Sequence, residues 1–309
     1  MFFRRDVLQS SRKIRRQNFF KKFSVLFALA LSATLSLSAL SDLDSLLVRG
    51  VEIRGNKAVS DTEIFKAIKQ NLSGRYLGLF NKQNALVYSV NGIEDAIKDG
   101  FSRIDAAKVE KGDDNKIIIS VVERKPEYVY CVGEKSLQCF YLDKTGIIFD
   151  HAPEFSEDVF FKIYGEASST ESILGTMVMN EEIFNGFMDF KKEIGSILEK
   201  DMITPKELDK KIYGLTIKDF DDYEFLVSSG NGKWKILFNV PQKDRYILKN
   251  QGVLKGEETQ SGIQSVFAEI SRNLQATVSS PVFLDNFKKP ARGLQYIDLR
   301  FGNKVVFKF

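Results

Sequence analysis

An uncharged stretch near the start of the chain constrains its fold more than any other feature. It runs from Phe23 to Leu40, FSVLFALALSATLSLSAL, and holds 18 residues without a charge. A helix of that length spans about 27 Å, close to the ~30 Å hydrocarbon core of a bilayer. Its Ser and Thr residues are compatible with a membrane helix, because their hydroxyl groups can bond back to the helix backbone. The stretch therefore predicts a transmembrane helix over residues 23–41, and no other stretch approaches this length.

The charges on either side of this stretch predict its orientation. Residues 1–22 carry eight Lys or Arg and one Asp, a formal charge of +7, whereas Asp42 and Asp44 follow the stretch. By the positive-inside rule the basic tail is cytoplasmic and residues 42–309 lie outside. Residues 23–309 hold 37 Lys or Arg against 40 Asp or Glu. The net charge of +4 thus belongs to the tail, and it does not indicate nucleic-acid binding.

A cleaved signal peptide is the alternative interpretation of the same stretch. Small residues near Ser36 and Ser38 would supply the cleavage site. Signal peptides usually have apolar regions of about 7–15 residues, and the basic region over residues 1–22 is long for one. We therefore favour a single-pass anchor in the cytoplasmic membrane, with a large extracytoplasmic part.

Residues 46–125 predict an α+β module in the order strand, helix, helix, strand, strand. Val51 and Ile53 alternate with polar residues, as in a strand with one buried face. Ser60 and Glu63 then have the spacing of a capping box, which predicts the start of the first helix. Apolar residues at intervals of four continue that helix as a single stripe.

The second half of this module is predicted from similar signals. Asn91 followed by Glu94 predicts the start of a second helix, and Gly100 near its end suits a left-handed C-cap. Two strands follow, separated by a Gly-Asp-Asp-Asn turn. The second of them, residues 116–122, is apolar on both faces, as expected for a central strand covered by helices.

Short motifs at both ends of the module resemble a known family. VRGVEIRGNKAVSDTEI opens the module, and IDAAKV and IIISVVERKP close it, with the matching positions Val51, Ile53, Gly55, Asn56, Glu123, Arg124 and Pro126. In order, spacing and place after an anchor, they resemble the POTRA module of the bacterial division proteins FtsQ and DivIB. The resemblance implies docking of membrane-proximal partners, with Glu123 and Arg124 as partner-binding candidates. A solvated strand end is the alternative for both residues.

Residues 126–309 predict a mixed β-sheet domain with packed helices. CFYLDKTGIIFD predicts a hairpin with Asp143 and Gly146 in its turn, and it matches the opening of the second FtsQ domain. Strands over residues 223–229 and 233–240 flank Gly-Asn-Gly, a second hairpin signal. Three capped helices are expected, beginning at Asn180, at the capping box Thr204 to Glu207, and at Ser261.

The end of the chain, YIDLRFGNKVVFKF, carries a further resemblance. Ile297, Leu299 and Phe301 are expected on one face of a strand, and Tyr296, Asp298 and Arg300 on the other. FtsQ-type proteins close their β domain with such a strand, a short turn and a last apolar strand; here Phe301 stands at the position of a tyrosine. The resemblance covers tail, anchor, module and β domain. The expected fold class is α+β, with one N-terminal transmembrane helix, a POTRA-type βααββ module and a mixed β-sheet domain.

The last strand predicts an interaction surface. A strand that ends at Phe309 has no downstream partner, so at a sheet edge its backbone could be extended by another chain. Lys304 and Lys308 would limit aggregation and favour an acidic partner. In FtsQ-type proteins the coiled-coil division protein FtsB (DivIC) adds a strand here, which nominates Arg300, Phe301, Asn303, Lys304, Val306 and Lys308. Burial in the core is the alternative for Phe301, and Arg300 on the opposite face is the safer candidate.

The sequence offers little that indicates catalysis. His151 is the only histidine and is expected in a surface loop; a secreted hydrolase built on it is the enzyme alternative. The phosphate-loop, HExxH and nucleophile-elbow motifs are absent, so we expect no metal and no cofactor. Cys131 and Cys139 are the only cysteines, and outside the membrane they could form a disulfide across a hairpin. A packed or free pair is the alternative.

The sequence therefore predicts a non-enzymatic scaffold of the divisome. The resemblance implies FtsB/DivIC-type and FtsL-type coiled-coil proteins as partners, and through them the septal peptidoglycan synthase. It also implies a location at the division septum, with no nucleic acid and no small-molecule substrate. The alternative is a POTRA-containing component of protein export or outer-membrane assembly.

Overall fold

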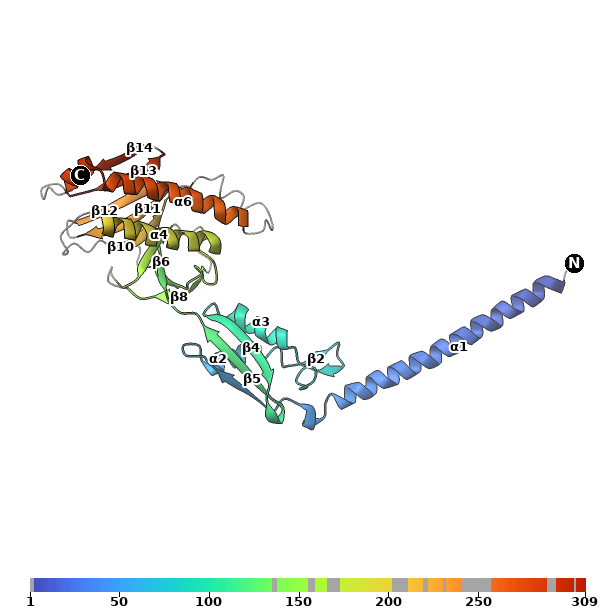
Figure 1. The fold of residues 1–309 in the computed structure, drawn as a ribbon. Helices are drawn as coiled ribbons and strands as arrows, with labels where there is room; N and C mark the ends of the chain where they lie inside the picture. The colour runs from blue at the N-terminus through green and yellow to red at the C-terminus, as the bar shows by residue number, and fades with distance from the viewer. Residues whose placement is uncertain are drawn as a thin grey trace. The chain divides into compact units, whose positions relative to one another are not determined.

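The structure, a computed structural model, is of mixed α+β class, as the sequence predicted (Figure 1). It describes residues 3–134, 138–154, 159–165, 173–201, 211–218, 222–229, 232–240, 257–287, 293–302 and 304–309. Within these stretches there are six α-helices and one large mixed sheet. The chain divides into two compact units, unit 1 over Met1–Glu123 and unit 2 over Arg124–Phe309.

Unit 1 begins with the long helix α1, Phe3–Leu40. Its part Arg16–Leu40 is long and apolar enough to cross a membrane. The hydroxyl groups of Ser24, Ser32, Thr34 and Ser36 bond back to the helix, as expected: Ser24 donates to the Phe20 carbonyl and Thr34 to the Leu31 carbonyl, both at 2.8 Å. These polar side chains therefore leave no unmet hydrogen bond that would oppose burial in lipid.

The rest of unit 1 is a three-stranded sheet with two helices on one face. In chain order it consists of β1 (Gly50–Arg54), α2 (Asp61–Ile68), β2 (Arg75–Tyr76), β3 (Phe80–Asn81), α3 (Val90–Gly100), β4 (Ile104–Lys111) and β5 (Lys116–Glu123). The sheet order is β1-β5-β4, with β5 parallel to β1 and antiparallel to β4. The predicted order of strand, helix, helix, strand, strand is present, and a small β2–β3 hairpin occupies the segment between the helices.

Helix α2 begins at the predicted capping box. The Ser60 hydroxyl accepts a hydrogen bond from the Glu63 N–H, and the Glu63 carboxylate accepts one from the Ser60 N–H (3.0 Å). The apolar stripe predicted for this helix, Ile64, Ile68 and Leu72, is buried in the core of unit 1. Local sequence therefore determined both the start and the buried face of α2.

Helix α3 begins two residues earlier than predicted. Ser89, rather than Asn91, is its N-cap, and its hydroxyl accepts from the Gly92 N–H at 3.0 Å. Glu94 instead accepts a hydrogen bond from the Val109 N–H of β4 (2.9 Å). Gly100 lies inside the helix without a positive φ, so its predicted role as a left-handed cap is also wrong.

Strand β5 is central, as predicted, but helices cover only one of its faces. Ile117, Ile119 and Val121 are buried in one cluster with residues of α2 and α3. On the other face Val122 is 57% exposed. The predicted central strand covered by helices is therefore present, with both helices packed against the same face.

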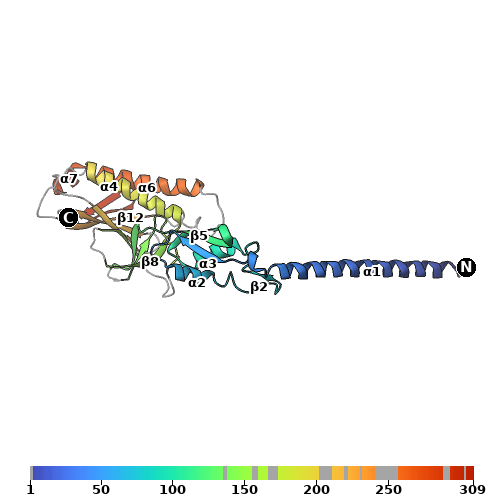
Figure 2. The ribbon, with the colours of Figure 1, turned by 90° about the horizontal axis from the view of Figure 1, so that it is seen from below.

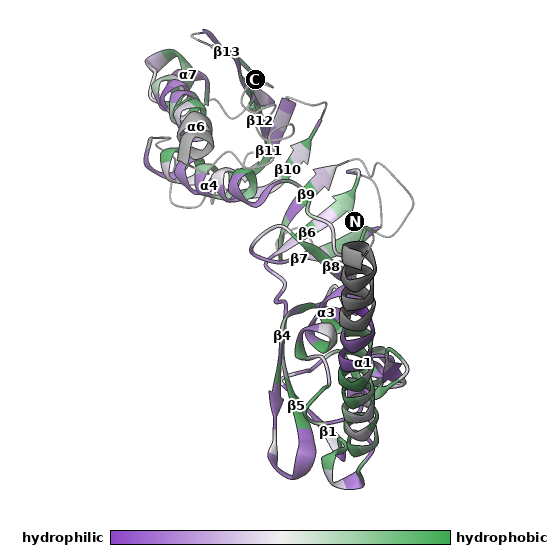
Figure 3. Ribbon diagram, turned by 90° about the vertical axis from the view of Figure 1, so that its right-hand side faces the viewer, coloured by the Kyte–Doolittle hydropathy of each residue, from purple (hydrophilic) through white to green (hydrophobic). Residues whose placement is uncertain are grey.

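Unit 2 is a nine-stranded mixed sheet with its helices on one face (Figures 2 and 3). The strands are β6 (Tyr128–Val132), β7 (Cys139–Leu142), β8 (Ile148–Ala152), β9 (Phe161–Gly165), β10 (Lys211–Ile217), β11 (Asp222–Ser229), β12 (Gly232–Asn239), β13 (Tyr296–Phe301) and β14 (Lys304–Lys308). Their order is β14-β13-β12-β11-β10-β9-β6-β7-β8, so β14 and β8 are the edge strands. The helices are α4 (Glu181–Asp201), α6 (Glu257–Val278) and α7 (Pro281–Phe287).

The core of unit 2 is rich in phenylalanine. Phe187 and Phe190 of α4 meet Phe267 of α6, and the rings of Phe190 and Phe267 stack with centroids 4.4 Å apart. The same two α4 rings contact Phe238 of β12. The regularly spaced apolar residues of these helices therefore cover the sheet, as their spacing predicted.

Two of the three helix starts predicted for unit 2 can be compared with the structure. Helix α4 begins after Asn180, whose side chain accepts from the Glu182 N–H at 2.8 Å. Helix α6 begins at Glu257, so Ser261 lies inside it and the predicted cap is wrong. Acidic residues are favourable in the first turn of a helix, which suits the earlier start. The predicted box at residues 204–207 lies outside the described residues.

Candidate docking edge

The edge strand β14 forms an antiparallel hairpin with β13, and β13 pairs parallel with β12. The predicted position of this strand at a sheet edge is therefore present. One face of β14 holds it in place: Phe307 and Phe309 contact Phe283 of α7, with ring centroids 5.2 and 5.6 Å apart. On the outer side of β14 no further strand pairs with it within the described residues.

The other face of β14 holds three of the nominated residues. Lys304, Val306 and Lys308 alternate with the core-facing residues, and both lysines are exposed. Asn303, nominated with them, lies outside the described residues. Two exposed cations flanking a half-buried valine leave room for a second backbone beside β14 and favour negative charge near it.

Arg300 is engaged inside the sheet. Its guanidinium donates to both carboxylate oxygens of Asp298 (2.9 and 2.7 Å) and to Asp222 of β11 (2.6 Å). These hydrogen bonds, first of all those to Asp298, raise the pKa of Arg300 above its usual value. Asp298 is buried and Arg300 only partly exposed. The arginine thus holds the end of β13 to β11, whereas sequence reasoning placed it among the partner contacts and gave no sign of Asp222.

Phe301, beside this arginine, is 57% exposed. The alternation along β13 buries Ile297 and Leu299 and would bury Phe301 too. The register of β13 against β14 shifts between Asp298 and Phe301, however, and such an irregularity redirects the side chains beyond it. The aromatic ring is therefore exposed at the turn end of the hairpin, as its nomination required, and burial in the core, the alternative for Phe301, is wrong.

Glu123 is held within unit 1. Its carboxylate accepts hydrogen bonds from the backbone N–H groups of Lys57 (2.7 Å), Ala58 (2.9 Å) and Val59 (3.0 Å), and lies 3.6 Å from Arg103. Burial alone would raise the pKa of Glu123, but the three backbone donors outweigh it and hold the pKa below its usual value. This residue fixes the loop between β1 and α2.

Arg124 and the cysteine pair stabilise the other end of the large sheet. Arg124 pairs with the buried carboxylate of Asp143, which also accepts from the N–H groups of Thr145 (2.9 Å) and Ile147 (3.0 Å) in the β7–β8 turn. Cys131 and Cys139 face each other across β6 and β7 and are joined by a disulfide. Within unit 2, Arg124 therefore lies near β7 and β8, at the end of the sheet opposite to β14.

No family model matches this chain, and no curated protein matches it. The FtsQ/DivIB assignment therefore remains a proposal that depends on the motifs and on the geometry of the edge.

His151 lies on strand β8, so its predicted place in a surface loop is wrong. Its side chain is exposed and its ring lies 4.9 Å from that of Phe140 on β7. Among the residues that the structure describes, no three His, Cys, Asp or Glu side chains gather in a way that could hold a metal ion.

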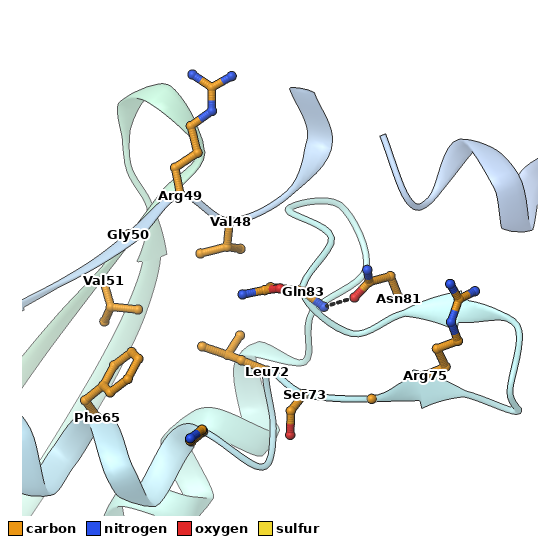
Figure 4. Close-up of a pocket in the computed structure, with 12 residues that line it drawn as sticks. Val48, Arg49, Gly50, Val51, Phe65, Leu72, Ser73, Arg75, Asn81 and Gln83 are labelled. Atoms are coloured by element: carbon orange, nitrogen blue, oxygen red, sulfur yellow. Dashed lines mark hydrogen bonds between the residues drawn. The ribbon is translucent and has the colours of Figure 1, made fainter. Parts of the chain in front are cut away.

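A hollow of about 550 Å³ lies in unit 1 between β1 and α2 (Figure 4). Val51, Phe65 and Leu72 give it an apolar floor, and Arg49 and Lys69 supply positive charge. Such a lining suits an apolar group next to an anionic one. The sequence gave no indication of this hollow, because its walls come from segments that are far apart in the chain.

Proposed function

We propose that this chain is a non-enzymatic docking protein of the bacterial divisome, of the FtsQ/DivIB type. The observation that carries the proposal is the β14 edge, where a strand side that no described strand pairs with, an exposed aromatic ring and two lysines lie together. The motif residues Ile297–Arg300 directly precede that edge. In this proposal α1 anchors the chain in the cytoplasmic membrane, and units 1 and 2 lie outside the cell's cytoplasm.

The mechanism is β-addition without turnover. A strand of the partner pairs with the outer side of β14, and its backbone hydrogen bonds supply the affinity. Phe301 offers an aromatic anchor beside the added strand, since aromatic side chains are frequent hot spots of interfaces. Lys304 and Lys308 favour acidic residues on the partner and raise the association rate. Arg300 acts through Asp298 and Asp222, by keeping β13 and hence β14 in register.

The partner proposed for this edge is a coiled-coil division protein of the FtsB/DivIC type, together with an FtsL-type companion. Through this pair the chain would be linked to the septal peptidoglycan synthase. Unit 1, with its strand, helix, helix, strand, strand order, would be a POTRA-type module that docks membrane-proximal partners. Partner binding by Glu123 or Arg124 stays a prediction, because both side chains also have internal bonds.

The cellular location of the chain tests this proposal. A fluorescent fusion is expected to gather at midcell in dividing cells, and depletion of the protein is expected to give filaments. Diffuse membrane fluorescence through the whole cell cycle, with normal division after depletion, would contradict the proposal. A pull-down of the FtsB/DivIC-type protein from the same cells then separates the division role from the specific edge. If a Phe301→Ala variant captures the FtsB/DivIC-type protein as efficiently as the native chain does, the proposed docking edge is wrong. The division role is not affected by that result.

A further inference from the structure

The β2–β3 hairpin of unit 1 is tied to the last turns of α1. The Ser38 hydroxyl donates to the Leu79 carbonyl (2.7 Å), the Asn81 N–H donates to the Ser41 hydroxyl (3.2 Å), and Arg75 pairs with Asp42 (2.7 Å). Figures 1 and 2 both show the hairpin beside the end of α1. Because Ser38 lies within one turn of Leu40, the hairpin tip is at the level where the apolar span ends.

The tip of this hairpin exposes leucine in a conformation that leucine rarely adopts. Leu77 is 94% exposed and has a φ of 51°, in the left-handed region that favours glycine or asparagine. Among the large apolar side chains that follow α1 in unit 1, it is the most exposed. Neither exposure to water nor backbone geometry accounts for a leucine at this position.

The residues around the tip have the composition of a membrane interface. Tyr76 and Phe80 are half-buried beside the tip, and the Lys82 ammonium lies 5.3 Å from the centre of the Tyr76 ring. Arg75 and Lys82 flank the sequence YLGLFN. Apolar tips bordered by tyrosine and basic residues are typical of elements that lie where acyl chains meet headgroups.

We propose that the hairpin inserts its tip, Leu77–Leu79, into the leaflet from which α1 emerges. The occupant of this surface is therefore lipid, and the argument for it is continuity with the apolar span through the Ser38 and Ser41 contacts. Two anchoring points close together would limit rotation of unit 1 about the helix axis. This inference rests on the proposed anchoring of α1 in a membrane.

Quenching of tryptophan by brominated lipid tests the inference in the full chain. The only native tryptophan, Trp234, is buried and its indole N–H has no hydrogen-bond partner among the described residues, so Trp234→Phe gives a suitable background. Leu77→Trp and the conservative Tyr76→Trp then probe the hairpin. The protein is reconstituted in vesicles of phosphatidylcholine and phosphatidylglycerol, with and without bromine on the acyl chains close to the headgroup.

The expected result is about a twofold loss of emission for both hairpin probes, since interfacial elements bury apolar groups some 5–10 Å into this boundary. Val122→Trp, on the open face of β5, is the matched exposed control and is expected to keep its emission. Leu35→Trp, within the span, reports on α1 itself. If Leu35→Trp is quenched and both hairpin probes behave like Val122→Trp, the hairpin inference is wrong and the anchor stands. If Leu35→Trp is not quenched, anchor and hairpin inference both fail.

Discussion

The two edge strands of the nine-stranded sheet have different neighbours. Beside β8, the segment 175–178 pairs with the start of the strand: the Gly175 N–H donates to the Ile148 carbonyl (2.7 Å), and the Ile148 N–H donates to the Thr176 carbonyl (2.9 Å). Beside β14, within the described part of the chain, only β13 pairs. Within the described residues, the chain thus pairs its own backbone with the start of one edge strand (the closed edge) and places no such segment beside the other (the open edge), a difference expected between a structural edge and a docking edge.

Both edges share one device, an arginine paired with a buried aspartate. Arg124 and Asp143 stabilise the turn before β8, and Arg300 and Asp298 stabilise the strand beside β14. The two edges therefore differ in the segments that pair with them, whereas each is stabilised by a similar arginine–aspartate pair. Changes to the closed edge should affect stability, and changes to the open edge should affect binding.

The largest effect is expected from Asp143→Ala at the closed edge. This change removes the acceptor of hydrogen bonds from Arg124, Thr145 and Ile147 and takes the buried carboxylate away from a partly buried guanidinium. We expect a loss of about 3 kcal/mol in the free energy of unfolding of unit 2. Urea unfolding followed by Trp234 fluorescence measures it. Asp189→Ala, which breaks an exposed ion pair with Lys192, should lower the free energy of unfolding by at most about 0.5 kcal/mol. Equal losses for Asp143→Ala and Asp189→Ala would contradict the stabilising role of the closed edge.

The next largest effect is expected at the open edge, from Phe301→Ala. Loss of the exposed ring should weaken binding of the FtsB/DivIC-type partner by about 2 kcal/mol, roughly 30-fold, because it removes an aromatic anchor. The stability of unit 2 should stay within about 0.5 kcal/mol, since the side chain is exposed. A binding isotherm measures the affinity. Val282→Ala, at a similarly exposed apolar position on α7, should leave the affinity unchanged. A loss of affinity similar to that of Phe301→Ala would contradict a specific role of the open edge in binding.

A pH dependence follows for Asp143. Burial on its own would raise its pKa, but hydrogen bonds from Thr145, Ile147 and Arg124 hold the pKa below its usual value. A carboxylate with a lowered native pKa stabilises the fold above its unfolded pKa of about 3.9 and loses this contribution as pH falls through the native pKa. We expect Asp143→Asn to cost about 1.5 kcal/mol at neutral pH and progressively less below about pH 4. Urea unfolding at several pH values measures this, and a constant difference would refute it.

The smallest effect is expected from reversing charge at the open edge. Lys308→Glu should weaken binding of an acidic partner by about 0.5 kcal/mol at low salt, mainly through the association rate. The difference should disappear at about 1 M salt, where charges are screened within about 3 Å. Lys144→Glu, at an exposed lysine in the turn beside the closed edge, is the control and should change neither the association rate nor the dissociation rate of the partner. Equal effects of the two reversals would indicate a general charge effect.

Local signals in the sequence were sufficient for much of the fold. The box formed by Ser60 and Glu63 and the apolar stripe of α2 were predicted because each depends on residues within a few positions of each other. Strand β14 was predicted at an edge from its place at the end of a hairpin. These features needed no knowledge of distant contacts.

The errors arose where a distant residue or a register shift decided the outcome. Glu94 bonds to Val109 of β4 and not to the start of its own helix. Arg300 pairs with Asp222, which lies 78 residues earlier in the chain. The shift between Asp298 and Phe301 exposes an aromatic ring that simple alternation would bury. Leu77 was missed because a glycine-containing loop gives no sign of which helix it will contact.

Amide hydrogen exchange of β14, with and without the FtsB/DivIC-type partner, tests the central claim most directly. The account predicts that alternate amides over Lys304–Lys308, those on the outer side of the strand, become protected when the partner binds. The amides of β8, over Ile148–Ala152, should exchange at the same rate in both states. Binding of the partner with unchanged exchange along β14 would contradict the account.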